Sequence, residues 1–240
     1  RSTLFPYTTL FRSDIDTDRL VQAFAREARG NGALIVTGAP VDTIRRRSGG
    51  GWDVQSGARG WSGRILVNAA GAWVDRVATM AGVAPLGFTP YRRSMARIPA
   101  PGGHDVSGWP MIFGAGETWY AKPDAGKLIV SPADEDPAEP HDAYPDDMVL
   151  AEGLARYEEM VTAPVTRLES SWAGLRTFAP DRVLVIGFDP HVPDFFWQAG
   201  QGGYGFQTSP AASRLAADLA GGTAPELDAA AVAALSPARF

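Results

Sequence analysis

Hydrophobic and polar residues alternate in patterns that divide the chain into short helices and strands. Residues 17–30 carry apolar positions at helical spacing, with Asp16 or Thr17 available as a cap and glycines near the end as a stop signal. Residues 33–37 (ALIVT) predict a buried strand. Turn residues separate three further strand candidates, so a β-meander is predicted over residues 41–67.

The middle of the chain predicts a different layout. Strand candidates at 89–98, 111–113, 118–121 and 127–131 are joined by proline and glycine turns. Because the turns are short, we expect two successive antiparallel hairpins.

The remaining pattern returns to alternating helices and strands. Residues 148–161 predict an amphipathic helix, and 182–187 and 195–199 predict buried strands. A long helix is expected to follow and to end at the Gly221–Gly222 pair, with residues 223–240 as a loosely held tail. Together these elements predict an α/β (α+β) fold.

Two strand-to-helix turns are candidates for ligand binding. The stretch 197–207 (WQAGQGGYGFQ) places four glycines between an apolar strand and a helix, and residues 68–71 (NAAG) follow another strand. Glycines let a backbone approach a ligand closely, and a helix N-terminus favours an anionic or electron-rich group. The alternative is a tight turn without a ligand.

Composition narrows the function classes. The net charge is −5 and the pI about 5.2, which gives no footprint for nucleic acid or an anionic membrane. No apolar run is long enough to span a bilayer, so a cytoplasmic protein is expected. The chain contains no cysteine, which excludes disulfides and cysteine-based metal sites. The acidic, proline-rich segment 134–147 is interpreted as a solvated loop, because its residues have no metal-ligand spacing.

The first residues need separate treatment. Residues 3–13 (TLFPYTTLFRS) resemble the translation of a common DNA-sequencing adapter. Residues 1–13 are therefore interpreted as an artefact, and the natural chain is expected to extend upstream of Asp14.

Three segments together resemble the FAD-dependent D-amino-acid oxidase/dehydrogenase superfamily (the DAO family). These are residues 68–73 (NAAGAW), 172–181 (WAGLRTFAPD) and 200–207 (GQGGYGFQ), in the family's order and spacing. The closest likeness is to the D-arginine dehydrogenase type, and it runs from about residue 14 to residue 222.

The resemblance implies a domain organisation. Residues 14–84 and 168–222 would form a discontinuous Rossmann-like FAD-binding domain, and residues 85–167 a substrate domain built on a mostly antiparallel sheet. The strand and G-x-G-x-x-G phosphate loop with which family members open are not present in this sequence. The FAD-binding domain is therefore expected to be incomplete.

The resemblance also implies site residues. Arg93, Tyr120 and Arg176 would act in catalysis by binding and positioning the substrate carboxylate, with Gly203 and Gln207 also contacting substrate. The residues expected to hold FAD are Val41, Ala69, Ala70, Gly71, Trp73, Gly174, Leu175, Gly202, Gly203, Tyr204, Gly205, Phe206 and Gln207. No metal is expected.

Each assignment has a simpler alternative. Arg176 could instead pair with Asp181 at the surface. Arg93 follows Arg92 in a strand, so one of the two would face outward. Tyr120 could pack in the core beside Trp119, and His191 is interpreted as a surface residue.

The implied activity is oxidation of the Cα–N bond of D-amino acids, with hydride transfer to flavin N5 and an imino acid as product. Without cysteine there can be no thioether link, so FAD would be bound non-covalently. Alternatives are a glycine/sarcosine-oxidase-like amine oxidase, a 2-hydroxy acid oxidase, and an inactive fragment unable to hold FAD. The sequence leaves oxygen and a quinone both open as electron acceptor.

Overall fold

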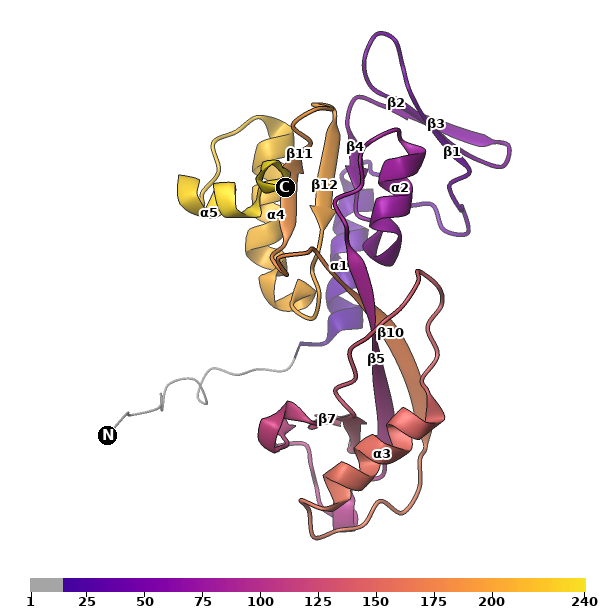
Figure 1. Ribbon diagram of the computed structural model, residues 1–240, viewed down its shortest axis with the longest axis vertical. Coiled ribbons are helices and arrows are strands. Elements are labelled where there is room, and N and C mark those ends of the chain that lie inside the picture. Colours follow the sequence, from indigo (N-terminus) through magenta and orange to yellow (C-terminus); the bar gives the residue numbers. More distant parts are fainter. Residues whose placement is uncertain (1–14) are drawn as a thin grey trace.

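The computed structural model describes residues 15–240, which form two parts joined by two long antiparallel strands (Figure 1). The predicted artefact at residues 1–13 lies outside the described residues. The helices are α1 (Thr17–Gly30), α2 (Val74–Met80), α3 (Asp147–Glu158), α4 (Gly205–Gly221) and α5 (Ala229–Leu235), with 3-10 turns η1 (Gly71–Trp73), η2 (Pro101–Gly103), η3 (Ala115–Glu117) and η4 (Pro237–Arg239). The strands are β1 (Thr43–Arg46), β2 (Trp52–Ser56), β3 (Arg59–Gly63), β4 (Leu66–Asn68), β5 (Thr89–Ile98), β6 (Ile112–Phe113), β7 (Tyr120–Asp124), β8 (Lys127–Ser131), β9 (Asp136–Pro137), β10 (Ser170–Phe178), β11 (Val185–Phe188) and β12 (Phe195–Ala199).

The lower part in Figure 1 is an antiparallel sheet with the strand order β10-β5-β8-β7-β6, and β9 also pairs with β5. Helix α3 packs on one face, where Ile98, Leu128 and Val130 from the sheet meet Trp119 and Tyr157 in one buried cluster. The predicted consecutive hairpins are confirmed, because β6 pairs with β7 and β7 pairs with β8, both antiparallel. The opposite face carries the side chains considered below.

The upper part contains a three-stranded sheet in the order β11-β12-β4. Strand β12 is antiparallel to β11 but parallel to β4, and β12 is buried on both faces. One face packs through Phe196 against Leu215 of α4, and the other packs through Trp197 against Val74 of α2. Burial on both faces explains why three consecutive residues of β12, 195–197, are apolar.

The predicted β-meander forms a small antiparallel sheet of β1, β2 and β3. Asp194, just before β12, holds it in place: its carboxylate accepts a hydrogen bond from Gly51 N–H at 3.0 Å and pairs with Arg46 at 3.0 Å. The indole Nε1 of Trp52 donates to the Asp194 carbonyl at 2.9 Å. The meander is therefore tied to β12 although more than a hundred residues separate them in sequence.

The strand predicted at residues 33–37 is wrong. These residues form no β-ladder in the described chain, and Leu34 and Ile35 are 74% and 40% exposed. Helix α1 begins after its cap Asp16, as predicted, but buries none of its side chains, with Phe24 58% exposed. A hydrophobic run makes a strand only where a neighbour satisfies its backbone groups, and none of the three sheets in the described chain reaches this segment.

The end of the chain also differs from expectation. Residues 223–240 were expected to be a loose tail, but they contain α5 and η4, and α5 packs on the face of β11. Arg239 donates to both carboxylate oxygens of Asp181, at 2.6 and 3.1 Å. This ion pair holds η4 against the connection between β10 and β11.

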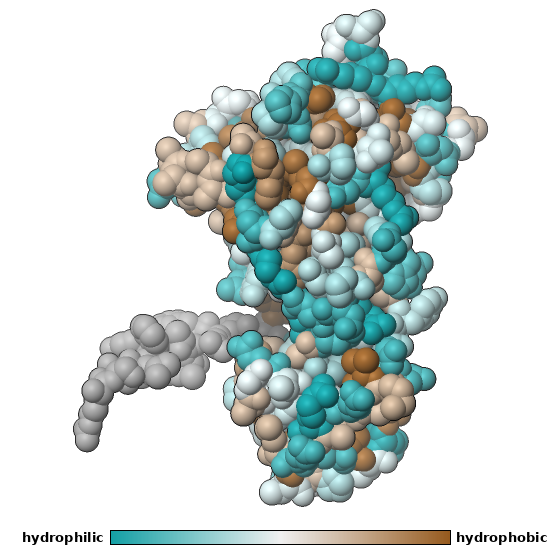
Figure 2. All heavy atoms as spheres, in the orientation of Figure 1, coloured by the Kyte–Doolittle hydropathy of each residue, from teal (hydrophilic) through white to brown (hydrophobic). Residues whose placement is uncertain are grey.

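Figure 2 shows hydrophilic residues across the neck between the two parts, where β5 and β10 pass, and brown hydrophobic residues scattered over the upper part. None of the helices in the described range 15–240 is both long and apolar enough to cross a membrane.

Candidate functional site

Two turns lie at the same edge of the upper sheet. Because β12 and β4 are parallel, their carboxyl ends meet there, so the loop after Ala199 and the turn after Asn68 are neighbours. The Asn68 side chain shapes its turn by donating to Val74 O at 2.8 Å and accepting from Ala70 N–H at 3.3 Å. The carboxyl edge of parallel strands is where open α/β sheets bind ligands. Here the structure brings the predicted residues 69–73 and 202–207 together.

The glycines of the loop after β12 are required by packing. A Cβ at Gly202 would lie 2.3 Å from Phe178, and one at Gly200 would lie 3.2 Å from Phe88. A Cβ at Gly203 would lie 3.1 Å from Nη1 of Arg176. The loop backbone therefore packs closely against β10, and Gly203 packs against the guanidinium of Arg176.

Helix α4 begins at Gly205, directly after this loop, and its cap residue Tyr204 makes no side-chain hydrogen bond to the first turn. The first N–H groups of a helix have no partner within the helix and carry a partial positive charge. Residues 205–207 therefore present backbone donors beside Gly203 and Arg176.

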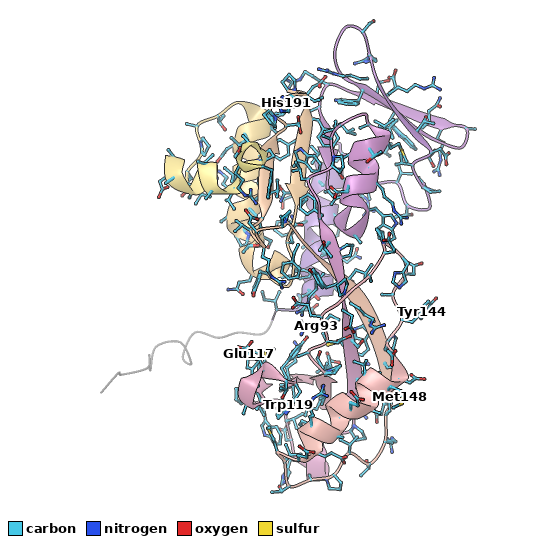
Figure 3. The ribbon with its side chains drawn as sticks, in the orientation of Figure 1. Arg93, Glu117, Trp119, Tyr144, Met148 and His191 are labelled. Carbon is cyan, nitrogen blue, oxygen red and sulfur yellow. The ribbon has the colours of Figure 1, made fainter. Side chains whose placement is uncertain are left out.

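Arg93, Tyr120 and Arg176 come together at the neck from three different strands. Arg176 Nη2 donates to the Tyr120 hydroxyl at 3.3 Å, and the Arg93 guanidinium lies 5.9 Å from the centre of the Tyr120 ring. Figure 3 shows Arg93 on β5 between the two parts of the molecule. Tyr120 is also buried, so the core-packing alternative correctly describes its ring, while its hydroxyl joins this cluster.

The electrostatics of this cluster favour an anion. Burial lowers the pKa of the Arg93 guanidinium below its ordinary value, and repulsion from Arg176 lowers it further, although Tyr120, Asp134 and Glu135 offset part of the effect. The Arg93 Nε is buried and has no hydrogen-bond partner in the described chain. Two close cations with an unused donor are suited to a bidentate carboxylate.

The alternative pairing of Arg176 with Asp181 is not found, because Asp181 pairs with Arg239. Arg92 and Arg93 point to opposite faces, as alternation requires. Arg92 pairs with Asp134 and Asp136, and Arg93 pairs with Glu135 at 3.4 Å.

The interpretation of residues 134–147 as a solvated loop is wrong at its start. Asp134 is buried, and its carboxylate accepts from both Ser94 N–H and Ser94 Oγ at 2.7 Å. Glu135 pairs with Arg93 and also with Arg182. The reason is that β9 pairs with β5, which carries the acidic residues onto an arginine-rich strand. The run of arginines at 92, 93 and 97 was the only sequence signal for these partners.

Other predicted residues remain separate or exposed. Val41 precedes β1 and is 41% exposed, and Trp73 at the end of η1 is 40% exposed. Gln207 is an exposed residue of the first turn of α4. Figure 3 places His191 at the far end of the upper part, well away from Arg93, and it is exposed.

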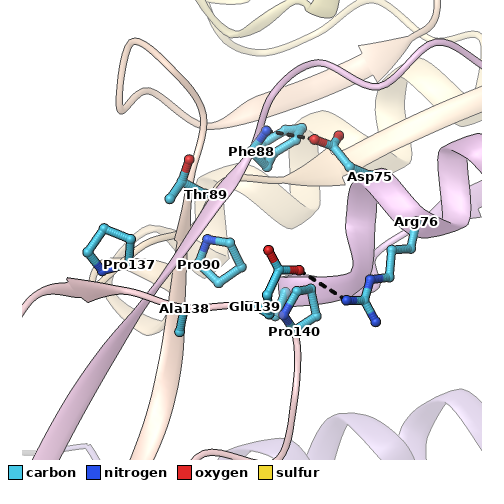
Figure 4. Close-up of a pocket in the computed structure, with 10 residues that line it drawn as sticks. Asp75, Arg76, Phe88, Thr89, Pro90, Pro137, Ala138, Glu139 and Pro140 are labelled. Atoms are coloured by element: carbon cyan, nitrogen blue, oxygen red, sulfur yellow. Dashed lines mark hydrogen bonds and ion pairs between the residues drawn. The ribbon is translucent and has the colours of Figure 1, made fainter.

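A cavity of about 430 Å³ lies elsewhere, between α2 and the β5–β9 pair (Figure 4). The Asp75 carboxylate accepts from Phe88 N–H at 2.8 Å beside it, and Arg76 pairs with Glu139 at 3.1 Å. None of the residues lining it belongs to the cluster of Arg93, Tyr120 and Arg176. The charged side chains that line the cavity are already bonded, and several of the lining residues are prolines. The cavity therefore presents few free polar groups to a ligand.

Within residues 15–240, no group of three or more histidine, aspartate or glutamate side chains is placed to hold a metal ion.

Comparison with known proteins identifies relatives. The family model described as FAD dependent oxidoreductase matches residues 9–219. FAD-dependent oxidoreductase domain-containing protein 1 of Xenopus laevis is 27% identical over 176 residues, covering 65% of this chain and 34% of that protein. D-amino acid dehydrogenase of Rhizobium johnstonii is 43% identical over 60 residues, covering 25% of this chain and 14% of that protein.

Solved structures share the fold. Glycine oxidase from Geobacillus kaustophilus superimposes with a TM-score of 0.74 at 24% identity, covering 89% of this chain and 56% of that one. L-proline dehydrogenase from P. horikoshii gives 0.77 at 22% identity, covering 94% and 60%. The chain thus spans about a third of the Xenopus protein and just over half of these two enzymes. The expected combination of a Rossmann-like part and an antiparallel-sheet part is confirmed.

Proposed function

The chain belongs to the FAD-dependent oxidoreductase family, and we propose that it oxidises the Cα–N bond of D-amino acids to give imino acids. The observation that carries the proposal is the cluster of Arg93, Tyr120 and Arg176 beside Gly203, because it is a ready site for the carboxylate of an amino acid. The family's cofactor is FAD.

The residues at the carboxyl edge of β12 and β4 fit FAD. The glycine loop offers an exposed backbone at Gly203, and the first turn of α4 offers unpaired N–H groups. Two buried acceptors beside the loop, Thr177 Oγ1 and Gln198 Oε1, have no hydrogen-bond partner in the described chain. The residues proposed to hold FAD are those expected from the sequence, namely Val41, Ala69, Ala70, Gly71, Trp73, Gly174, Leu175 and residues 202–207.

The domain assignment is proposed with these residues. Residues 14–84 and 168–222 would hold FAD, and residues 85–167 would hold the substrate. Strand β10 lies within the segment 168–222, but it pairs along its whole length with β5 of the substrate domain. It is therefore shared between the two domains. The Arg176 side chain is thus carried by a strand that joins both parts.

FAD, when bound, supplies the acceptor for the hydride that leaves Cα as the nitrogen lone pair forms the imine. Arg176 and Arg93 would bind the two carboxylate oxygens, and the Tyr120 hydroxyl would donate a further hydrogen bond. Fixing the carboxylate at three donors removes rotational freedom from Cα, which is one contribution that a protein makes to such a reaction. The α4 N-terminus would stabilise negative charge that develops beside it.

Reconstitution tests the proposal. The full chain, incubated with FAD and separated from free cofactor, should retain yellow colour and release it on denaturation, since no cysteine is present for a thioether link. Anaerobic addition of a D-amino acid should bleach the visible flavin band. A folded chain that retains no FAD would contradict the proposal and favour the alternative of an inactive fragment.

The same experiment tests the glycine/sarcosine-oxidase-like alternative. Bleaching by glycine or sarcosine, but not by D-amino acids with larger side chains, would favour a glycine/sarcosine-oxidase-like amine oxidase. Repeating the reaction in air and with an added quinone would identify the electron acceptor.

A further inference from the structure

The face of the lower sheet that carries Arg93 continues into an apolar surface. In the register of β5 and β10, Arg93 lies opposite Gly174, and Met95 lies opposite Trp172. Alternate residues of a strand share a face, so Met95 and Trp172 lie on the same side as Arg93 and Arg176. Along β10 the order on this face is Arg176, Gly174, Trp172.

Gly174 leaves open space between the charged and the apolar residues. A Cβ at this position would meet no atom within 4 Å. Arg93 lies directly opposite Gly174 on β5, Arg176 follows Gly174 along β10, and the pair of Trp172 and Met95 lies on the other side. The exposed Gly174 backbone therefore leaves this part of the face uncovered.

The apolar end of this face extends through Met95. The Tyr120 hydroxyl contacts Met95 Sδ at 3.6 Å, and the Phe113 ring lies 6.0 Å from the Tyr120 ring. Trp172 is 38% exposed and Phe113 51% exposed, whereas the side chain of Arg93 is only 11% exposed. Exposed aromatic side chains next to a charged site are typical of a ligand surface.

Two acidic side chains near this face are paired with arginines. Asp124 pairs with Arg97, whose guanidinium stacks on Trp172 at 5.5 Å. Glu135 pairs with Arg93 and Arg182. A basic substrate side chain, as in the D-arginine dehydrogenase type, would have to compete with these arginines, whereas an apolar group would not.

We propose that Trp172 and Met95, over Gly174, form the subsite for an apolar side chain or N-substituent of the substrate, so that uncharged, apolar amino acids are preferred to basic ones. The inference rests on the proposed carboxylate site and gives the specificity of that site. Trp172 and Met95 are specificity-determining residues here, and Arg93 and Arg176 hold the common carboxylate.

Binding of simple carboxylates separates the two parts of the site. Dissociation constants of acetate, benzoate and 4-guanidinobutanoate are measured by ligand-observed NMR on the full chain saturated with FAD. Wild type should bind benzoate roughly tenfold more tightly than acetate, because a group buried in an apolar pocket gives about this discrimination. The guanidino compound should bind no better than acetate.

Variants locate the preference. Trp172→Ala should remove the preference for benzoate and leave acetate binding unchanged, whereas the control Trp61→Ala, in the β-meander, should change neither. Met95→Gln provides a second variant in case Trp172→Ala fails to fold. A preference for benzoate that survives both substitutions, or tighter binding of the guanidino compound, would overturn the subsite while leaving the carboxylate site intact. Failure of wild type to bind any of the three would overturn the proposed function and the subsite together.

Discussion

Arg176 on β10 donates a hydrogen bond to the Tyr120 hydroxyl on β7, although β5 and β8 lie between these strands in the sheet. Two long side chains therefore meet across the face of the sheet, and the guanidinium of Arg93 on β5 lies 5.9 Å from the centre of the Tyr120 ring. The arrangement holds the Arg176 guanidinium against Gly203 of the glycine loop. A carboxylate bound here would lie where the two parts of the molecule join.

Tyr120→Phe should weaken carboxylate binding without unfolding the sheet. The ring keeps its packing against Phe113, and only the hydroxyl is lost. A hydrogen bond to a charged carboxylate contributes about 1.5–3 kcal/mol, so we expect roughly ten- to hundredfold weaker acetate binding by NMR titration. The melting temperature should stay close to wild type. Unchanged acetate affinity would show that the Tyr120 hydroxyl makes no contact with the ligand.

Gly203→Ala should displace Arg176. The new methyl group would lie 3.1 Å from Nη1, and the arginine side chain can move more easily than the loop backbone. Acetate affinity should fall roughly as far as in Tyr120→Phe, because an arginine out of position loses its hydrogen bonds to the ligand. Gly221→Ala is the matched control, since nothing lies within 4 Å of its Cβ position. If both variants bind acetate equally well, the close approach of Gly203 to Arg176 has no role in binding.

Asp194→Ala should loosen the β-meander. Partial burial raises the pKa of Asp194, but the hydrogen bonds from Gly51 N–H and Arg46 outweigh it and hold the pKa below its usual range. Losing hydrogen bonds to a charged group costs about 1.5–3 kcal/mol, and the exposure of Arg46 favours the lower end of this range.

Thermal unfolding measures the effect. Asp194→Ala should lower the melting temperature, and hydrogen exchange should accelerate in β1 and β2. Arg45→Ala, on the exposed face of the same strand, should leave both unchanged. Equal melting temperatures for the two variants would contradict the role assigned to Asp194.

The contact between Asp181 and Arg239 should make the attachment of the C-terminal segment dependent on pH. The hydrogen bond from Arg239 lowers the pKa of Asp181 below its usual value, and hydrogen bonding to Val183 N–H contributes in the same direction. Because the pKa is lower in the folded state, this stabilisation is present at neutral pH and is lost as the pH falls through the folded-state pKa.

Limited proteolysis follows this attachment. Cleavage between residues 223 and 240 should increase below about pH 4, near the ordinary aspartate pKa. Arg239→Ala should give the same increase already at pH 7, with a loss of at most about 1 kcal/mol because Asp181 is partly exposed. Cleavage that does not change with pH or with the substitution would show that Arg239 does not hold the segment.

The sequence predicts most elements where local pattern and packing agree. Strands β5, β8 and β12 have the predicted bounds, because each has a clear strand pattern and lies beside a strand that pairs with it. The helix end at Gly221–Gly222 is also confirmed, with Gly222 in the left-handed conformation that a helix stop requires. Strand β10 was not predicted, since its glycine and polar residues hide the alternation that its pairing with β5 imposes.

The candidate site depends on contacts that spacing cannot show. No pattern places Arg93, Tyr120 and Arg176 together, and they were selected through the family resemblance. The role of Glu135 was missed because a run of acidic residues resembles a solvated loop until the pairing of β9 with β5 is known. Residues 33–37 show the converse error, where a strand-like run has no neighbour within the described chain.

Anaerobic reduction of the FAD-loaded chain tests the central claim most directly. Paired D- and L-enantiomers of an apolar amino acid are mixed with wild type and with Arg176→Lys, and loss of the visible flavin absorbance is followed. We expect the D-enantiomer to bleach wild type. Arg176→Lys should retain FAD but bleach at least tenfold more slowly, because lysine keeps the charge and loses the bidentate geometry. Equal rates for wild type and Arg176→Lys, or bleaching by the L-enantiomer alone, would contradict the account.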